Sequence, residues 1–344
     1  MGPGTPLVEK LRIVVILITL SLLWGSSFLA IKITVDAIQP ILVFGVRFVL
    51  AGLILLAIHY MISLMHYSSK NDKSNNYYSN EVKKLRFWKD SLILGLFLIV
   101  GGQGLLAWGT QYLSSGVSAL INSTIPLWVA IFTLIFFGKR PTKMSTAGLI
   151  AGFGGLVILV LPSLLDAEVN LAGIISLILS SVFWALGSIY SNSRRLTKSH
   201  VDNIFMPSGI FMTVGGAILL IISGIANNVA IEEFRVEVVQ LFTGNILMAF
   251  LFLTLVCTVV GYAEFYWLLR TTTASLANTF AYIVPVIAII LGWIILHEVM
   301  TSQTVIATCI ILIGVALMIV KSPSEIASTT KDSTKNWKIP LYAR

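Results

Sequence analysis

Amide and aromatic side chains stand inside long apolar stretches of this sequence, where they could bind a small solute without reacting with it. Serine and threonine repeat at helical spacing in two stripes, at 176–188 and 254–266. Such residues often join packed membrane helices, and for these stripes helix packing and substrate binding are equally good explanations. Bulky amides and rings do not serve close packing, so a binding role is preferred for them. The candidate substrate-binding residues are Trp24, Gln103, Asn122, Trp184, Tyr262, Asn278 and Tyr282. They predict a mildly polar, aromatic and nearly uncharged cavity, which suits neutral or zwitterionic substrates.

Two charged residues interrupt apolar stretches, and each has a functional and a structural interpretation. An arginine at the centre of a membrane helix costs roughly 2.5 to 3.5 kcal/mol on insertion scales. Arg47 could anchor a carboxylate or phosphate, or it could be a structural cation that reaches outward or bonds helix-end carbonyls. Glu264 could carry a coupling proton, or it could pair with Arg270 or meet water at the inner end of its helix.

Two prolines occupy positions at which the candidate cavity helices could bend. Pro126 follows Asn122, and Pro285 follows Tyr282, within about one helical turn. A proline leaves the carbonyl one turn earlier without its usual donor, so it can kink the helix or offer an acceptor to a cavity. We expect both prolines to bend their helices.

The sequence contains no catalytic constellation. It has no H-E-x-x-H and no aspartate-rich metal motif, and its four histidines are scattered. Cys257 and Cys309 lie in apolar segments without metal-type spacing. We therefore expect that the protein is not an enzyme and that it has no catalytic residue, metal or cofactor.

Membrane helices must position these residues, because 57% of the 344 residues are hydrophobic and only 11% are charged, against about a quarter in a soluble domain. Runs of about 20 apolar residues predict an all-α integral membrane protein with ten transmembrane helices. The predicted spans are 11–31, 40–63, 90–110, 116–137, 145–162, 170–190, 203–225, 243–268, 275–296 and 303–320.

The basic residues predict the orientation of these helices. With the N-terminus inside, 20 of the 23 Lys and Arg residues lie in inner segments, Lys32 and Arg235 lie outside, and Arg47 lies within the second span. Both termini are therefore expected in the cytoplasm, in a multi-pass protein of the cytoplasmic (inner) membrane. The net charge of +8 belongs to this topology signal rather than to a nucleic-acid-binding face. The polar inner loop 64–89 is predicted to be a mobile linker, and 322–344 a polar cytoplasmic tail.

The chain contains an internal repeat. Four identities share an offset of 159 residues, and Trp24 matches Trp184 one residue off that register. The four pairs are Gly102 with Gly261, Trp108 with Trp267, Pro126 with Pro285, and Gly155 with Gly314. Because five spans per half is an odd number, the repeats 1–163 and 169–321 must enter the membrane from opposite sides. The alternative is chance matching of Gly and Trp in an apolar sequence.

Ordered motifs stand at both ends of this duplicated region. The first two helices carry Trp24-Gly-Ser-Ser-Phe-Leu-Ala-Ile-Lys32, then Pro40 and Arg47-Phe48. The last two carry Pro285 through Leu296-His-Glu298, then Gln303 and Ile313-Gly-Val-Ala-Leu-Met318. These motifs resemble the EamA family of the drug/metabolite transporter (DMT) superfamily, over nearly the whole chain.

The resemblance implies a ten-helix inverted-repeat fold whose third, fourth, eighth and ninth helices surround the cavity. It also implies substrates among amino acids, related metabolites or drugs. Arg47 belongs to the general pattern of the family, so the structural interpretation of this residue is preferred. Where the family has a Gly-Glu pair at the end of the fourth helix, this chain has Gly138-Lys139.

These observations predict a secondary transporter that works by alternating access, with export preferred to import. Its expected partners are a small-molecule substrate and the lipid bilayer, without nucleic acid, and it would be a monomer or a homodimer. A coupling proton is a further partner only under the functional interpretation of Glu264. A channel-like facilitator and a non-transport membrane receptor are the alternatives. An intramembrane enzyme is disfavoured because no catalytic constellation is present.

Overall fold

The computed structural model describes residues 7–67, 85–138, 142–165, 170–193, 205–227, 239, 241–272 and 274–319, and every regular element in these ranges is a helix. Seven described helices are long and apolar enough to cross a membrane, as an integral membrane protein requires. Their apolar spans are Leu11–Val35, Pro40–Leu64, Phe87–Thr110, Ser115–Phe137, Leu171–Ser191, Phe205–Ile225 and Gly244–Leu269. Three shorter apolar helices, Lys143–Leu159, Val284–Ile295 and Ser302–Gly314, coincide with the other segments of the ten-span prediction.

The described helices of the first half follow one another along the chain. They are α1 (Leu7–Val35), α2 (Pro40–Tyr67), α4 (Leu85–Leu94), the π-helical η1 (Gly95–Gly104), α5 (Leu105–Thr110), α6 (Ser115–Asn122), α7 (Ile125–Phe137) and α8 (Lys143–Leu165). The inner loop predicted at 64–89 lies largely outside the described residues, as does the tail predicted at 322–344.

The second half repeats this order of elements. It comprises α9 (Leu171–Ser193), α10 (Phe205–Asn227), α12 (Gly244–Leu251), the π-helical η2 (Phe252–Val260), α13 (Gly261–Thr271), α14 (Ala274–Ala277), the 3₁₀-helical η3 (Asn278–Tyr282), α15 (Val284–Ile295) and α16 (Ser302–Ile319).

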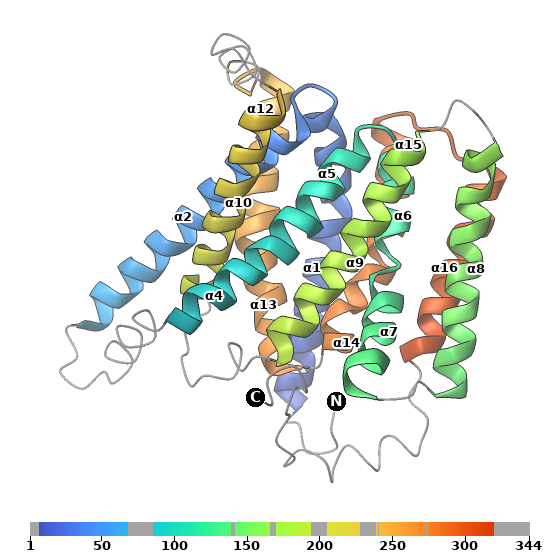
Figure 1. Ribbon diagram of the computed structural model, residues 1–344, viewed down its shortest axis with the longest axis horizontal. Helices are drawn as coiled ribbons and strands as arrows, with labels where there is room; N and C mark the ends of the chain where they lie inside the picture. Colours follow the sequence, from blue (N-terminus) through green and yellow to red (C-terminus); the bar gives the residue numbers. More distant parts are fainter. Residues whose placement is uncertain are drawn as a thin grey trace.

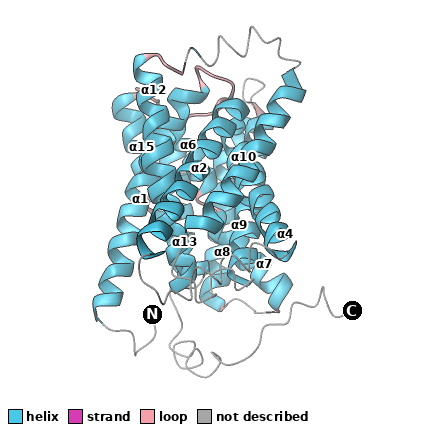
Figure 2. Cartoon of the chain, turned by 90° about the vertical axis from the view of Figure 1, so that its left-hand side faces the viewer, coloured by secondary structure: helices cyan, strands magenta, loops and turns pink. Residues whose placement is uncertain are grey.

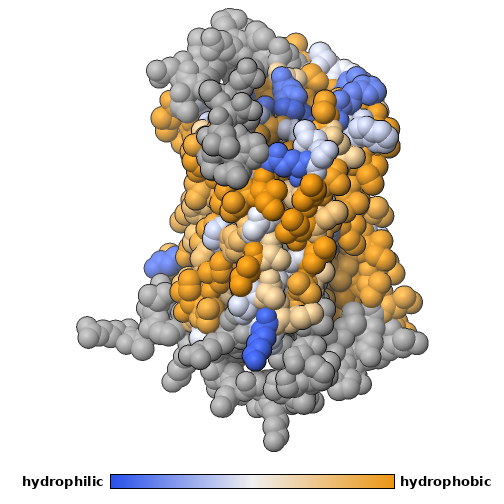
Figure 3. Space-filling model, turned by 90° about the vertical axis from the view of Figure 1, so that its right-hand side faces the viewer, coloured by the Kyte–Doolittle hydropathy of each residue, from blue (hydrophilic) through white to orange (hydrophobic). Residues whose placement is uncertain are grey.

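Helices from the two halves pair at both edges of the bundle. α2 lies along α10 at one edge, and α8 lies along α16 at the other, with the remaining helices between them (Figure 1). The helices extend between the two ends of the bundle (Figure 2). The described residues form no strand. On the face seen in Figure 3, apolar side chains form a broad band across the middle, and hydrophilic residues gather toward the two ends. A surface of this kind faces lipid along its middle and water at its ends.

Two spans that the sequence predicts as continuous helices, 116–137 and 275–296, are interrupted. The first breaks between Asn122 and Ile125, and the second passes through a 3₁₀ segment before α15 begins at Val284. Pro126 and Pro285 each lie in the first turn after the break. The N–H that a proline lacks would have no helical acceptor at this position, so the proline costs no hydrogen bond. At the first break, the hydroxyl of Thr124 donates to the carbonyl of Ile121 at 2.7 Å. Such local bonds allow irregular backbone at membrane depth.

The third and eighth spans differ from ordinary α-helices at matching places. Each contains a π-helical segment, η1 in the first half and η2 in the second. Hydrophobic periodicity did not reveal these segments, because an apolar sequence is compatible with both an α-helix and a π-helix. π-helical turns are rare and are frequent at functional sites, and both segments lie beside the centre of the bundle.

Glycines bring the edge helices into backbone contact. A Cβ added at Gly52 would lie 2.7 Å from the carbonyl oxygen of Gly209, and one added at Gly209 would lie 2.9 Å from that of Gly52. At the other edge, a Cβ at Gly314 would lie 2.5 Å from the amide nitrogen of Gly152. Small residues at such crossings let membrane helices approach closely, because packing rather than water drives their association.

Replacing Gly52 with alanine should therefore destabilise the protein. The added methyl group meets backbone atoms of Gly209 and Thr213 as well as the Thr213 hydroxyl. Moving the hydroxyl alone does not relieve the contact, so α2 and α10 must separate, and overpacking of this kind costs about 1–3 kcal/mol. Gly224→Ala is the matched control, because a Cβ at Gly224 in α10 meets nothing within 4 Å. Thermal unfolding of the purified protein in detergent should show a lower midpoint for Gly52→Ala alone. Equal midpoints for the two variants would refute the close contact.

Candidate functional site

A small cavity lies between the two halves at the centre of the bundle. Its volume is about 30 Å³, counted as the space open to the centre of a water molecule. One water needs roughly 10–15 Å³ by that measure, so the cavity has room for about two waters. The lining residues are Trp24, Ser27, Phe28, Ile31, Arg47, Gln103, Leu106, Asn122, Ile125, Trp184, Tyr262, Phe280 and Val284. A metabolite would need more room than this, so the cavity must enlarge to admit one.

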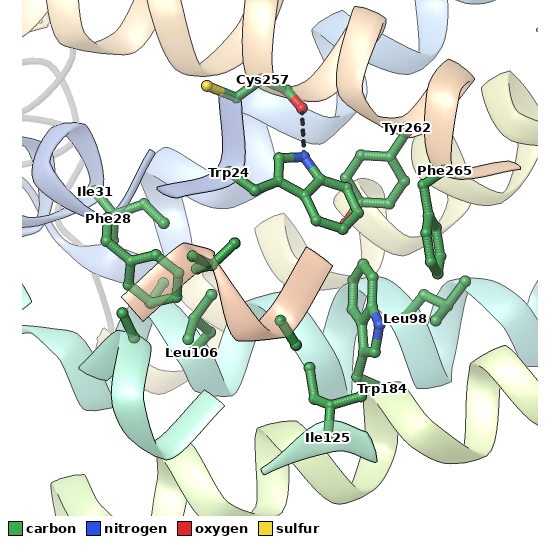
Figure 4. Packing of buried hydrophobic residues seen from close by; sticks show 14 of the residues in the cluster. Trp24, Phe28, Ile31, Leu98, Leu106, Ile125, Trp184, Cys257, Tyr262 and Phe265 are labelled. Carbon is green, nitrogen blue, oxygen red and sulfur yellow. Dashed lines mark hydrogen bonds between the residues drawn. The ribbon is translucent and has the colours of Figure 1, made fainter. Parts of the chain in front are cut away.

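Trp24 of α1 and Trp184 of α9 meet at the cavity. Their rings lie edge to face, with centroids 5.5 Å apart and an interplanar angle of 85°. The indole nitrogen of Trp24 donates to the carbonyl oxygen of Cys257 at 3.0 Å (Figure 4). The indole nitrogen of Trp184 donates to the side-chain oxygen of Asn278 at 3.2 Å. Each ring therefore has its polar end anchored, which fixes its orientation.

Further rings enclose the tryptophan pair. The centroid of Phe280 lies 4.6 Å from that of Trp24, and the centroid of Tyr262 lies 5.5 Å from it, both in edge contacts. Figure 4 shows Phe265 beside Trp184, where their centroids are 5.4 Å apart. Edge and tilted contacts of this kind are each worth about 0.5–1.5 kcal/mol beyond the buried area. The cavity wall is thus mainly a cluster of mutually supporting rings.

Two glycines allow the tryptophans to sit where they do. A Cβ at Gly261 would lie 2.5 Å from the indole nitrogen of Trp24, and a Cβ at Gly102 would lie 3.2 Å from the ring of Trp184. Gly102 and Gly261 are one of the pairs that share the 159-residue offset. Each half therefore supplies a glycine against which the tryptophan of the other half packs.

Arg47 is buried among the rings and lines the same cavity. Its side chain is 3% exposed, and its Nε donates to the hydroxyl of Thr258 at 2.7 Å. The guanidinium carbon lies 4.8 Å and 5.0 Å from the ring centroids of Phe44 and Phe48. The side chain thus turns inward, away from the outward orientation that one sequence-based interpretation assigned to it.

The structure places the other sequence-predicted residues at different depths. Gln103 and Asn122 line the cavity with the two tryptophans and Tyr262, whereas Asn278 stands behind Trp184 as its hydrogen-bond acceptor. Tyr282 is partly buried and is not one of the lining residues.

Glu264 lies away from the cavity wall. Its carboxylate accepts a hydrogen bond of 2.8 Å from the hydroxyl of Thr19 in α1. Its predicted alternative partner, the side chain of Arg270, lies outside the described residues. Across the described ranges, no three His, Cys, Asp or Glu side chains gather in a way that could hold a metal ion.

The serine stripe of α9 bonds a neighbouring helix rather than the cavity. Ser176 donates to the carbonyl oxygen of Leu105 at 2.7 Å, and Ser180 donates to that of Gly102 at 2.6 Å. These are interhelical hydrogen bonds of the kind that glue membrane helices together. For these two serines, the packing explanation holds.

Sequence reasoning missed part of the cavity wall. Ser27 and Phe28 lie one turn beyond Trp24 on α1, and Phe280 and Val284 flank the break before α15. Helical spacing from Trp24 could have indicated Phe28. The other three carry no signal that distinguishes them from ordinary core residues.

A carboxylate fixes the start of α6, the helix that carries Asn122. Glu298, in the connection between α15 and α16, accepts hydrogen bonds from the Ser115 amide at 2.6 Å, the Ser115 hydroxyl at 2.8 Å and the Gly116 amide at 3.3 Å. A carboxylate is favourable at a helix N-terminus because the first amides lack partners and the helix dipole is positive there. His297, with a φ of 54°, turns the chain so that Glu298 reaches this position.

Comparison with known proteins gives a family match over both halves. The EamA-like transporter family matches residues 11–161 and again 171–320. The chain is 27% identical over 281 residues to the uncharacterized inner membrane transporter YedA of Escherichia coli K12, with 80% of each chain covered. It is 25% identical over 304 residues to the uncharacterized transporter YoaV of Bacillus subtilis, covering 87% of this chain and 94% of that one. A protein of known crystal structure shares the fold, with a TM-score of 0.60, 18% identity and coverage of 90% and 97%.

Removing the Glu298 carboxylate should loosen the start of α6. Glu298→Ala leaves two backbone amides and a hydroxyl without their acceptor, and a hydrogen bond to a charged group is worth about 1.5–3 kcal/mol. Thermal unfolding should therefore begin at a lower temperature. The control is Val299→Ala, because Val299 is the next residue along the chain and its side chain is 86% exposed. A stability equal to that of the control would contradict the capping role.

Proposed function

The chain belongs to the EamA-like transporter family, and from this premise we propose that it is a secondary carrier which moves a small metabolite across the cytoplasmic membrane by alternating access. The homologues named as transporters support a transport function in general. The observation that carries the finer proposal is the cavity between the two halves, where Trp24 and Trp184 meet.

The small volume of the central cavity supports a carrier over a pore. Space for about two waters is enough for neither a metabolite nor a continuous water column, given the roughly 10–15 Å³ that one water needs. A channel-like facilitator would need an open path or rings of charge along its axis. A carrier needs a central site that opens to one side at a time, and the interrupted helices α6–α7 and α14–α15 border this cavity.

Reciprocal contacts support the inverted relation between the repeats 1–163 and 169–321. Trp24 packs on Gly261 of the other half, and Trp184 packs on Gly102, its counterpart in the first half. Gly155 and Gly314, another matched pair, both lie where α8 approaches α16. A twofold axis in the membrane plane would produce contacts of this kind. Together with the basic residues predicted inside, this favours ten spans with both termini in the cytoplasm.

The aromatic wall favours a substrate with a flat or bulky apolar part, of about amino-acid size. The expectation of a neutral or zwitterionic substrate assumed a nearly uncharged cavity, but Arg47 lines it. Among amino acids, related compounds and drugs, this cation favours compounds that carry an anionic group, with export as the preferred direction.

Counterflow in proteoliposomes tests the carrier proposal. Purified protein is reconstituted, loaded with an unlabelled solute from a panel of amino acids, nucleosides and amphiphilic drugs, and then exposed to a trace of the same solute in labelled form. A carrier should show saturable uptake that is accelerated by the internal solute. Unsaturable, conductive flux would instead establish a pore, and the absence of flux across the panel would favour a receptor.

Asn122 and Tyr282 should differ in their effect on transport. Asn122→Ala removes an amide from the cavity wall and should lower the counterflow rate by about two- to tenfold, the range for one lost neutral hydrogen bond. Tyr282→Ala changes a residue outside the lining set and should have the smaller effect. Rates are compared at equal amounts of reconstituted protein. The reverse order of effects would move the binding site toward α15.

A further inference from the structure

Arg47 holds an unused hydrogen-bond donor inside the central cavity. Its Nε is bonded to Thr258, but its Nη1 is fully buried and has no hydrogen-bond partner among the described residues. A guanidinium has five N–H donors in one plane and keeps its charge in proteins. Burying a cationic donor without a protein partner is costly unless an acceptor in the cavity compensates it. The residue is therefore equipped for an acceptor that the protein itself does not supply.

Tyr262 offers a second unused donor at the same cavity. Its side chain is 2% exposed, and its hydroxyl is buried without a hydrogen-bond partner in the part of the chain that the structure describes. The ring of Tyr262 lies 5.9 Å, centroid to centroid, from the ring of Phe48, which also packs on the Arg47 guanidinium. Two buried donors from α2 and α13 thus line one small cavity. Both would suit the two oxygens of a carboxylate.

No carboxylate of the described residues neutralises Arg47. Glu298 binds the start of α6, Glu264 accepts from Thr19, and Asp36 pairs with Lys32 at 2.7 Å. Arg47 is the one charged residue among those that line the cavity. The cavity therefore carries one net positive charge, which selects for a solute with one negative charge.

We propose that this cavity is the binding site for an amphiphilic monocarboxylate. Arg47 and Tyr262 would hold its carboxylate, and the rings of Trp24, Trp184 and Phe280 would enclose its apolar body. The inference rests on the proposed carrier function and deepens it, because it assigns the charge and shape of the transported solute.

The same groups discriminate against other charge types. A zwitterion would bring an ammonium group into a cavity whose described lining has no carboxylate to receive it, and an unpaired buried ammonium is strongly unfavourable. A phosphate ester carries up to two charges and would require more than one cation. A neutral amide of the same shape would leave the Arg47 donor opposite an uncharged oxygen. The monocarboxylate is therefore preferred over all three.

Equilibrium dialysis with three matched probes tests this order. The probes are 3-phenylpropionate, 3-phenylpropanamide and L-phenylalanine, which share one carbon skeleton and differ in charge. Wild-type protein in detergent should bind 3-phenylpropionate at least about tenfold more tightly than either of the others, as expected for a hydrogen bond to a charged group. Equal affinity for the amide, or undetectable binding of the propionate, would overturn the inference without any variant.

Variants then locate the preference. Arg47→Gln should remove the tenfold advantage of the propionate over the amide, and Arg47→Lys should retain part of it. Lys32→Gln is the matched control, because it removes a positive charge that pairs with Asp36 outside the cavity wall. Should Arg47→Gln fail to fold, Tyr262→Phe removes only a hydroxyl, and it should reduce the advantage by about two- to tenfold. A folded Arg47→Gln variant that keeps the full advantage would also overturn the inference.

Counterflow with the same probes separates this inference from the carrier proposal. If 3-phenylpropionate binds through Arg47 but shows no saturable counterflow, the anion site stands and the carrier function falls. If the amide is carried as well as the propionate, the carrier function stands and the anion site falls.

Discussion

A membrane interior offers no water to polar groups, so hydrogen bonds in this bundle must close within the protein. That constraint explains why the helix breaks occur beside hydroxyl groups, and why Ser176 and Ser180 donate to carbonyls of the adjacent helix. It also gives meaning to the exceptions at the centre. The Nη1 of Arg47 and the hydroxyl of Tyr262 have no hydrogen-bond partner among the described residues, and both lie at a cavity where a bound solute could supply one.

The rings at the centre turn this electrostatic feature into a shaped site. Trp24 and Trp184 are held by their indole nitrogens, so their faces and edges have fixed directions when a solute arrives. A pre-oriented aromatic wall loses little conformational entropy on binding, which favours affinity from few contacts. The polar anchors lie behind the rings, on Cys257 and Asn278, so the rings themselves remain available to an apolar ligand.

Sequence reasoning found the elements and several of the cavity residues, because both depend on local composition. Spans follow from apolar runs, and Trp24, Gln103, Asn122, Trp184 and Tyr262 are conspicuous as bulky polar or aromatic groups within them. It could not find what depends on distant partners. The Arg47 bond to Thr258 joins residues 211 positions apart, and the Glu298 cap on Ser115 spans 183. Pro126 and Pro285 indicated a bend near each helix interruption, but the π-helical turns were missed, since hydropathy does not report backbone geometry.

The edge pairs limit how the bundle can move. α2 and α8 belong to the first family repeat, and α10 and α16 belong to the second. At each edge, therefore, the two repeats pack closely against each other, with backbone contacts at glycines. The two repeats therefore cannot separate as rigid bodies without losing the packing at both edges. Movement is left to the inner helices α6–α7 and α14–α15, which are interrupted. The edge pairs in this sense form a rigid frame around inner helices that can bend.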